Sequence, residues 1–131
     1  MKKSHDLCSN KNSKIFVSYT TRDSIINKES LASLLSIIST LGKPFIDLIH
    51  NDSPMKQARV KSELQNSSLL LLLETASVEQ SQWVQWEIKM AKSCGIPVKS
   101  IKIRNVMPTE QQLIVALNGL KWGTQPVRRD R

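Results

Sequence analysis

Cysteine is scarce in this sequence and long apolar runs are absent, and both features narrow the class of protein. The two cysteines, Cys8 and Cys94, lie in unlike settings, so neither a disulfide framework nor a metal-binding spacing can be built from them. No apolar run is longer than the one from Leu69 to Leu73, which is far too short to cross a bilayer. The first residues are polar and lack the apolar stretch of a secretory signal. We therefore expect a cytoplasmic, reduced protein with no metal and no membrane anchor.

Sequence motifs of several large enzyme classes are also absent. Neither GxGxxG nor GxxxxGKS/T occurs, so a Rossmann-type dinucleotide site and a P-loop are both unsupported. There is no GxSxG for serine catalysis, and the only histidines are His5, near the N-terminus, and His50, which we expect to be a solvated loop residue. A phosphoacceptor receiver domain would need paired acidic residues after its first strand and an aspartate after its third. This chain has SYTTRD and Glu74 at those places.

What the sequence has in excess is positive charge, with a formal net charge of +8. The charge gathers toward the two ends, at Lys2, Lys3, Lys11, Lys14, Arg128, Arg129 and Arg131. We interpret residues 1–13 as a flexible basic leader and residues 123–131 as a basic tail that aid solubility. No zinc pattern and no aromatic RNA-binding motif is present, so we expect no specific nucleic-acid partner.

A chain of 131 residues supports a single domain with one core, which we place at residues 14–122. Short apolar runs at 15–17, 43–49, 68–74 and 95–103 predict strands. Helical periods follow each of them, over 27–42 with Gly42 as the stop and with Asn27 or Asp23 as the cap, then over 56–67, 82–94 and 108–120. This alternation predicts an α/β fold, a flavodoxin-like doubly wound parallel sheet of four to five strands with flanking helices.

The stretch SQWVQWEIKMA, Ser81 to Ala91, contains a glutamate in an unexpected place. On a helical projection, Glu87 falls inside the apolar stripe that Trp83, Val84, Ile88, Met90, Ala91 and Cys94 form. The carboxylate is therefore either buried in a structural pair or lines a cavity that Trp83 helps to wall, while Ser81 is a fitting cap. In such folds ligands sit at the carboxyl ends of the strands, and Glu87 faces that edge.

A lone carboxylate limits the chemistry that this site can perform. It cannot supply the two-carboxylate mechanism of a glycosidase. It can clamp a ribose through its hydroxyls and stabilise an oxocarbenium-like transition state, which suffices when the leaving group is already activated. The pyridinium of NAD+ is such a leaving group. Trp83 could stack on the ligand or simply pack in the core.

Three stretches together resemble a known family, the Toll/interleukin-1 receptor (TIR) domains. KIFVSYTTRD, Lys14 to Asp23, is similar to their opening strand and loop. SQWVQWEIKMA resembles their signature of Ser, Trp, a Glu four residues after the Trp, an apolar residue and Ala. GIPVKSIKI, Gly95 to Ile103, is similar to the strand that follows. The resemblance is to compact bacterial TIR-like proteins of the Thoeris-type defence group, although the usual fifth strand is hard to find because IRNVMPTEQ is short.

The resemblance implies a function and a site. Many bacterial members of the family cleave NAD+, releasing nicotinamide and making ADP-ribose or a cyclised variant, and in Thoeris systems the cyclised product signals to an effector. It thus implies an anti-phage NAD+ glycohydrolase or cyclase with NAD+ as substrate and no cofactor, which associates with itself or with another TIR-containing or effector protein. Glu87 matches the catalytic glutamate. Ser18, Tyr19, Arg22, Asp47 and Trp83 would bind the substrate.

Three other functions stay open at this point. The first is a non-enzymatic TIR interaction module, which would bind a partner TIR domain. The second is a nucleoside deoxyribosyltransferase-like enzyme, which shares the fold and a carboxylate but forms a covalent glycosyl-enzyme intermediate. The third is a nucleic-acid binder that uses the basic tails.

Overall fold

Strands and helices alternate along the chain, as the sequence predicts. The computed structural model describes residues 13–51 and 54–118. In chain order these form β1 (Lys14–Ser18), α1 (Lys28–Ile38), β2 (Lys43–Ile46), α2 (Asp47–His50), α3 (Lys56–Gln65), β3 (Leu69–Glu74), the 3-10 helix η3 (Val78–Gln80), α4 (Gln82–Ser93), β4 (Val98–Lys102) and α5 (Glu110–Asn118). The predicted basic tail, His5, Cys8 and nearly all of the predicted leader lie outside the described residues.

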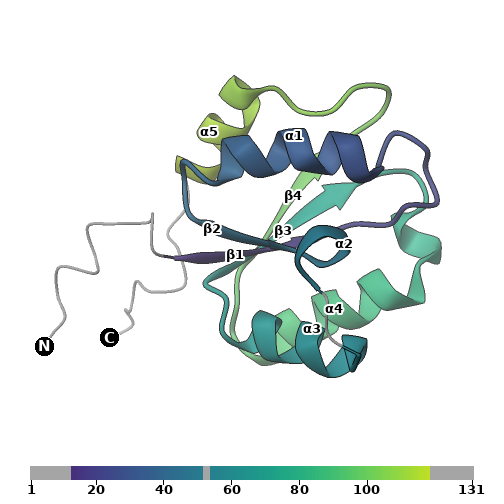
Figure 1. Cartoon of the computed structure of the whole chain (residues 1–131), viewed down its shortest axis with the longest axis vertical. Coiled ribbons are helices and arrows are strands. Elements are labelled where there is room, and N and C mark those ends of the chain that lie inside the picture. Colours follow the sequence, from purple (N-terminus) through teal and green to yellow (C-terminus); the bar gives the residue numbers. More distant parts are fainter. Residues whose placement is uncertain (1–12, 52–53, 119–131) are drawn as a thin grey trace, which may run out of the picture.

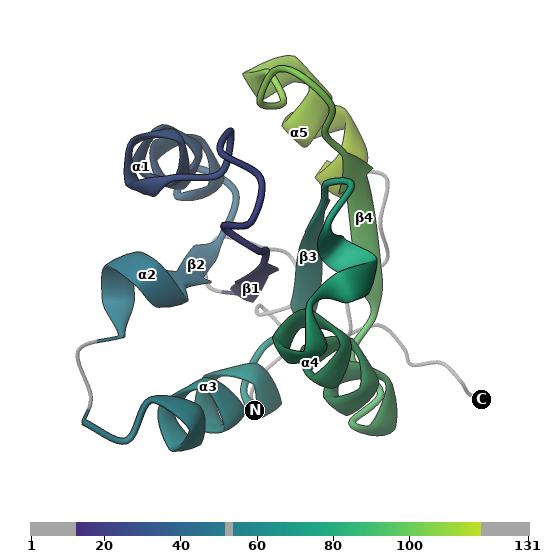
Figure 2. The same cartoon turned by 90° about the vertical axis from the view of Figure 1, so that its right-hand side faces the viewer.

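The strands form one parallel sheet in the order β2-β1-β3-β4. Helices α1 and α5 cover one face of this sheet and α3 and α4 cover the other, while α2 lies at the carboxyl end of β2 (Figure 1). The view in Figure 2 shows the same two layers on either side of the strands. The predicted α/β doubly wound fold is thereby confirmed, with four strands among the described residues.

The leucine run of β3 joins the two halves of the core. Leu69, Leu71 and Leu73 pack in the layer beneath α1 and α5, together with Leu31 and Leu113. The alternate leucines, Leu70 and Leu72, pack on the other face, where α3 and α4 bring Val60, Leu64, Val84 and Ala91. All five leucines are buried, as expected of a central parallel strand covered on both faces.

The second strand is shorter than the prediction of 43–49. It ends at Ile46, because Asp47 begins the single-turn helix α2. The Nδ1 atom of His50 accepts the backbone N–H of Ile46 at 2.9 Å, and the His50 ring lies 5.9 Å from that of Phe45. The expectation that His50 is a solvated loop residue was wrong, since its half-buried ring closes this helical turn.

The two ends of α1 differ in how well the sequence predicted them. Asn27 is the cap, because its side chain accepts the backbone N–H of Ser30 while the Ser30 hydroxyl accepts the N–H of Asn27. At the other end, Gly42 does not stop the helix, which already ends at Ile38. The hydroxyls of Ser39 and Thr40 donate to backbone carbonyls of the last turn, at 2.7 Å in each case. These carbonyls would otherwise need backbone N–H groups from a further helical turn. No helix within the described residues is long and apolar enough to cross a membrane.

Candidate functional site

A pocket of about 260 Å³ opens at the carboxyl edge of the sheet. The loop after β1, the start of α2 and the start of α4 form its walls. Its lining residues are Val17, Tyr19, Thr20, Thr21, Asp47, Leu48, Ser81, Trp83 and Glu87. Three segments far apart in the sequence therefore meet at the place where doubly wound folds bind ligands.

Glu87 reaches the pocket from the buried face of α4. The Ser81 hydroxyl caps this helix by accepting the backbone N–H of Val84 at 3.2 Å, so the predicted cap is confirmed. Glu87 lies one turn further along and is only 3% exposed. The hydroxyl of Ser18, itself buried at the end of β1, donates to Oε1 of Glu87 at 2.6 Å. The carboxyl group is thus both paired to a buried hydroxyl and part of a pocket wall.

The surroundings of Glu87 favour its neutral form. Burial raises the pKa of Glu87 to about 8, and the nearby charge of Asp47 acts in the same direction. The hydrogen bonds from the side chains of Ser18 and Trp83 oppose this shift, because they stabilise the carboxylate. A carboxyl group with a pKa near neutrality is poised to change its protonation state when a charged ligand binds nearby.

The predicted apolar stripe of α4 is only partly buried. Val84, Glu87 and Ala91 are its buried residues, whereas Trp83 is 39% exposed and Cys94 is exposed. The Trp83 ring lies 5.4 Å from the ring of Trp86, which packs on the core. The sheet therefore covers a narrower face of the helix than the projection suggested. Trp83 stands at the rim of that face, where it walls the pocket and remains open to solvent.

Tyr19 links two walls of the pocket. Its hydroxyl oxygen accepts the backbone N–H of Leu48 at 2.8 Å, which ties the loop after β1 to the start of α2. Burial raises the pKa of Tyr19 to about 12, so the phenol keeps its proton at neutral pH and can donate it. The neighbouring Asp47 accepts a hydrogen bond from the side chain of Asn51 at 2.6 Å.

The structure separates the predicted site residues into three places. Tyr19, Asp47, Trp83 and Glu87 line the pocket, and Ser18 lies behind Glu87 without lining it. Arg22 is exposed and does not line the pocket, although its backbone N–H donates to the Thr20 hydroxyl at 3.2 Å.

Three further residues with hydroxyl groups line the pocket, although the sequence did not lead us to assign them to the ligand. They are Thr20, Thr21 and Ser81. Thr20 and Thr21 sit between the predicted Tyr19 and Arg22, and Ser81 was predicted only as a helix cap. Their place in the same two loops is the signal that could have identified them.

A second hollow of about 400 Å³ lies nearer to β4. Asp23, Glu74, Thr75, Ala76, Lys102, Ile103 and Arg104 line it. The carboxylate of Asp23 accepts the backbone N–H of Ser77 at 3.1 Å and the Ser77 hydroxyl at 3.0 Å. The nearby Thr75 side chain and the hydrogen bonds from Ser77 lower the pKa of Asp23. Asp23 therefore joins two loops and does not cap α1.

The charge of the Glu87 pocket is distinctive within a basic protein. Among residues 13–51 and 54–118, its lining contains two carboxyl groups, those of Asp47 and Glu87, and no lysine or arginine. No group of three or more His, Cys, Asp or Glu side chains in the described part of the chain could hold a metal ion. The pocket is thus suited to a ligand that carries positive charge, hydroxyl groups or both.

Comparisons with known proteins agree with this description of the fold. A 2-deoxyribosyltransferase from Bacillus psychrosaccharolyticus has a similar structure, with a TM-score of 0.52 and 13% sequence identity over 80% of this chain and 82% of that one. No curated protein matches the sequence. The parallel sheet and the pocket at its carboxyl edge define a doubly wound α/β domain. Residues 16–112 match the family described as the TIR-like domain of the Thoeris protein ThsB, and the chain belongs to this defence-associated family.

Proposed function

We propose that this protein cleaves the nicotinamide–ribose bond of NAD+, and that Glu87 is its catalytic residue. The observation that carries the proposal is the buried Glu87 carboxyl group in the wall of a pocket whose described lining residues include no lysine or arginine. Membership of the Thoeris TIR-like family supports the same reading. The product would be ADP-ribose or a cyclic ADP-ribose signal of anti-phage defence, made in the cytoplasm.

The charge of the pocket determines how NAD+ would enter it. The pyridinium of the nicotinamide is the cationic end of the dinucleotide, and it would face the carboxyl groups of Asp47 and Glu87. The phosphates are anionic and would stay outside the pocket, where the exposed Arg22, next in the chain to the lining residue Thr21, would contact them. The pocket volume of about 260 Å³ is below the roughly 300–1,000 Å³ of typical ligand pockets. The pocket would therefore hold only the nicotinamide ribosyl half of NAD+.

The chemical step requires little more than electrostatic stabilisation. The bond between C1′ of the ribose and the pyridinium nitrogen breaks, and its electron pair leaves with neutral nicotinamide. The sugar becomes an oxocarbenium-like cation, which the Glu87 carboxylate stabilises while it holds the ribose hydroxyls. Water then adds to C1′ and loses a proton, giving ADP-ribose, or the adenine of the same molecule attacks and closes a ring.

The raised pKa of Glu87 fits this sequence of events. In the free protein at neutral pH, much of Glu87 is protonated, because burial penalises its charge. A bound pyridinium would favour the carboxylate, so that substrate binding and proton release are coupled. Trp83 at the pocket rim would pack against the nicotinamide ring, and the Tyr19 hydroxyl would donate to the ligand.

Nicotinamide release from NAD+ at high protein concentration tests the proposal. We expect release by the native protein and a loss of at least a hundredfold with Glu87→Gln, which keeps the size of the side chain but not its charge. Glu79→Gln is the matched control, since Glu79 is exposed and lies outside the pocket lining. Equal rates for native protein and Glu87→Gln would overturn the assignment.

Two further arms of the assay address the alternative functions. Free deoxyribonucleosides offered with an acceptor base would reveal a deoxyribosyltransferase, the activity named for the similar structure. If neither NAD+ nor nucleosides react, and if binding of a TIR-containing partner survives Glu87→Gln, the protein is an interaction module. Self-association or a TIR-containing partner would also cover the part of NAD+ that extends beyond the pocket, which is why the protein concentration is kept high.

A further inference from the structure

The outer edge of β4 is a row of backbone groups that no described strand pairs with. The sheet ends at β4, and Figure 2 shows no described helix or strand beyond it. Edge strands of this kind can accept an added strand from another chain. The side chains around the edge decide which partner would fit.

The hydrogen-bond pattern fixes which residues of β4 face outward. The Pro97 carbonyl accepts the N–H of Leu70 at 2.9 Å, and the N–H of Ile103 donates to the Glu74 carbonyl at 3.0 Å. In a parallel ladder, alternate residues direct both backbone groups to the same neighbour. Lys99 and Ile101 therefore face β3, and Val98, Ser100 and Lys102 direct their N–H and C=O groups away from the sheet.

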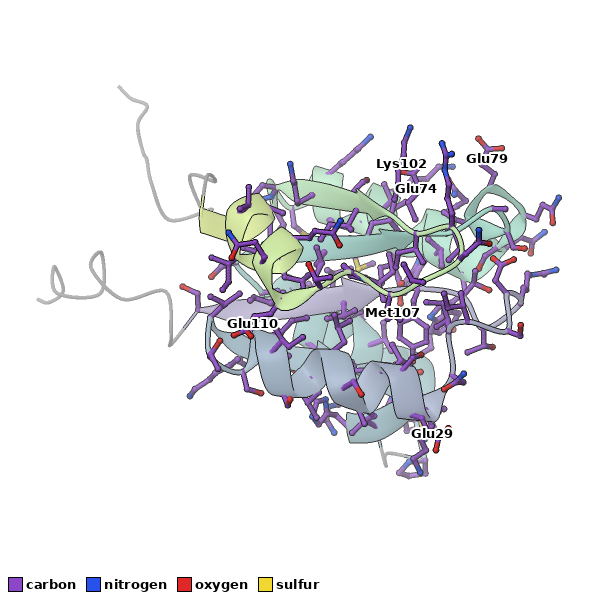
Figure 3. The ribbon with its side chains drawn as sticks, turned by 90° about the horizontal axis from the view of Figure 1, so that it is seen from above. Glu29, Glu74, Glu79, Lys102, Met107 and Glu110 are labelled. Carbon is purple, nitrogen blue, oxygen red and sulfur yellow. The ribbon has the colours of Figure 1, made fainter. Side chains whose placement is uncertain are left out.

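The surface beside this edge is both apolar and basic. A hollow of about 480 Å³ runs between β4 and α5, where Ile101, Val115 and Ala116 contribute apolar surface and Val115 is 62% exposed. Lys99 and Lys102 flank it. Figure 3 shows the Lys102 side chain extending away from the sheet beside Glu74. From residue 98 to 109 the sequence has Lys99, Lys102 and Arg104 but no acidic residue.

We propose that the β4 edge binds an extended, acidic segment of a partner protein as an additional strand. Its backbone would pair with Val98, Ser100 and Lys102. Since side chains alternate along a strand, its apolar side chains would enter the hollow beside Val115 on one face, and its acidic side chains would meet Lys102 on the other. A second copy of this chain is a poor occupant, since each copy carries a formal charge of +8. The chain ends are predominantly basic and would be repelled in the same way.

A fluorescent synthetic peptide that alternates glutamate with isoleucine is the probe, measured by fluorescence polarisation against the full-length protein. We expect saturable binding that weakens as salt rises, and much weaker binding of the same peptide with lysine in place of glutamate. Absence of binding at millimolar protein, or equal binding of the lysine peptide, would overturn the proposal.

Because alternate residues of β4 direct their backbone groups outward, a substitution can remove an outward N–H and leave the hydrogen bonds to β3 intact. Ser100→Pro removes an outward N–H without removing a bond to β3, so the protein should stay folded while peptide affinity falls about tenfold or more. Ser100→Ala keeps that N–H and should bind as the native protein does. If Ser100→Pro unfolds the protein, hydrogen exchange of the native protein replaces this test. Peptide binding at the β4 edge should then slow the exchange of the Ser100 and Lys102 amides, and unchanged exchange would contradict the proposal.

Other occupants would be visible in the same material. Sedimentation of the native protein at matched concentrations reports whether two copies associate. A dimer that Ser100→Pro dissociates would mean that a second copy occupies the edge, which contradicts the acidic-partner proposal. Failure of the peptide to bind would leave the proposed NAD+ cleavage standing, because β4 contributes no residue to the Glu87 pocket.

Discussion

Glu87 is the residue at which stability and the proposed activity oppose each other. A carboxyl group that is 3% exposed loses most of its hydration, and the hydrogen bonds from the Ser18 and Trp83 side chains offset this loss only in part. Its pKa of about 8 in the folded protein lies above the ordinary 4.5. The folded state therefore holds a proton that the unfolded state releases between these two pH values.

The first prediction concerns the pH dependence of stability. Since the folded-state pKa is raised, the contribution of Glu87 to the free energy of unfolding is fully present below pH 4.5 and is lost as pH rises through about 8. Glu87→Gln lacks this loss, so the variant should match the native protein near pH 5 and exceed its stability above pH 8. Each pKa unit corresponds to about 1.4 kcal/mol, enough to resolve by urea unfolding at both pH values. A native protein more stable than the variant at pH 9 would contradict the burial argument.

The second prediction concerns Ser18, which we assign to orienting Glu87 and not to contacting substrate. The 2.6 Å hydrogen bond stabilises the carboxylate, so Ser18→Ala should raise the pKa of Glu87 above its native value. A titration of the Glu87 carboxyl carbon by NMR measures this shift without any need for activity. Ser33→Ala, on the exposed side of α1, is the control. An unchanged or lowered pKa would show that Ser18 does not stabilise the charged form.

Helix α2 depends on a bond from outside itself. With four residues it has too few internal hydrogen bonds to be stable alone, and Tyr19 supplies an acceptor for the Leu48 N–H. The position of Asp47 in the pocket wall therefore follows from the loop after β1 as well as from β2.

The third prediction tests that connection. Tyr19→Phe leaves the Leu48 N–H without its acceptor, at a cost of about 1 kcal/mol. We expect about fivefold faster hydrogen exchange at the Leu48 amide, the factor that corresponds to about 1 kcal/mol. The Leu70 amide, which donates to the Pro97 carbonyl in another part of the sheet, is the internal control and should exchange as before. Equal protection of Leu48 in both proteins would mean that α2 is held by other contacts.

How far the sequence predicts these elements depends on whether the signal is local. The leucines of β3, the Ser81 cap and the place of Glu87 in an apolar stripe follow from period and spacing, and the structure confirms them. For α1 the sequence left Asn27 and Asp23 open, and the structure selects Asn27. The short α2, by contrast, is built by distant groups, so its residues looked like strand. Likewise, the exposure of Trp83 depends on how much of α4 the sheet covers. A helical projection shows only the angles between side chains and cannot predict the width of the covered face.

The molecule as a whole is basic, whereas its candidate site is acidic. The formal charge of +8 would attract an anionic dinucleotide over a distance of roughly the Debye length, about 8–10 Å near physiological salt. The Asp47 and Glu87 carboxyl groups would then select its cationic end locally. This arrangement separates the capture of NAD+ from its orientation.

The fourth prediction follows from this separation. Raising the salt concentration should increase KM for NAD+ several-fold and leave kcat nearly unchanged, because salt screens the exposed charges more than the buried pocket. Nicotinamide riboside, which has no phosphate, should not show such an increase. Steady-state kinetics of the two substrates at several salt concentrations make the comparison. A KM for NAD+ that does not respond to salt would exclude a role for the overall charge.

The pH profile of nicotinamide release tests the central claim most directly, since it asks whether the Glu87 carboxylate is the acting group. The native protein should show kcat/KM for NAD+ that rises with pH and levels off above about 8, the pKa of Glu87 in the free protein. Glu79→Gln, the control variant, should follow the same curve. A profile that is flat or falls through this range, or no release at any pH, would contradict the assignment of Glu87.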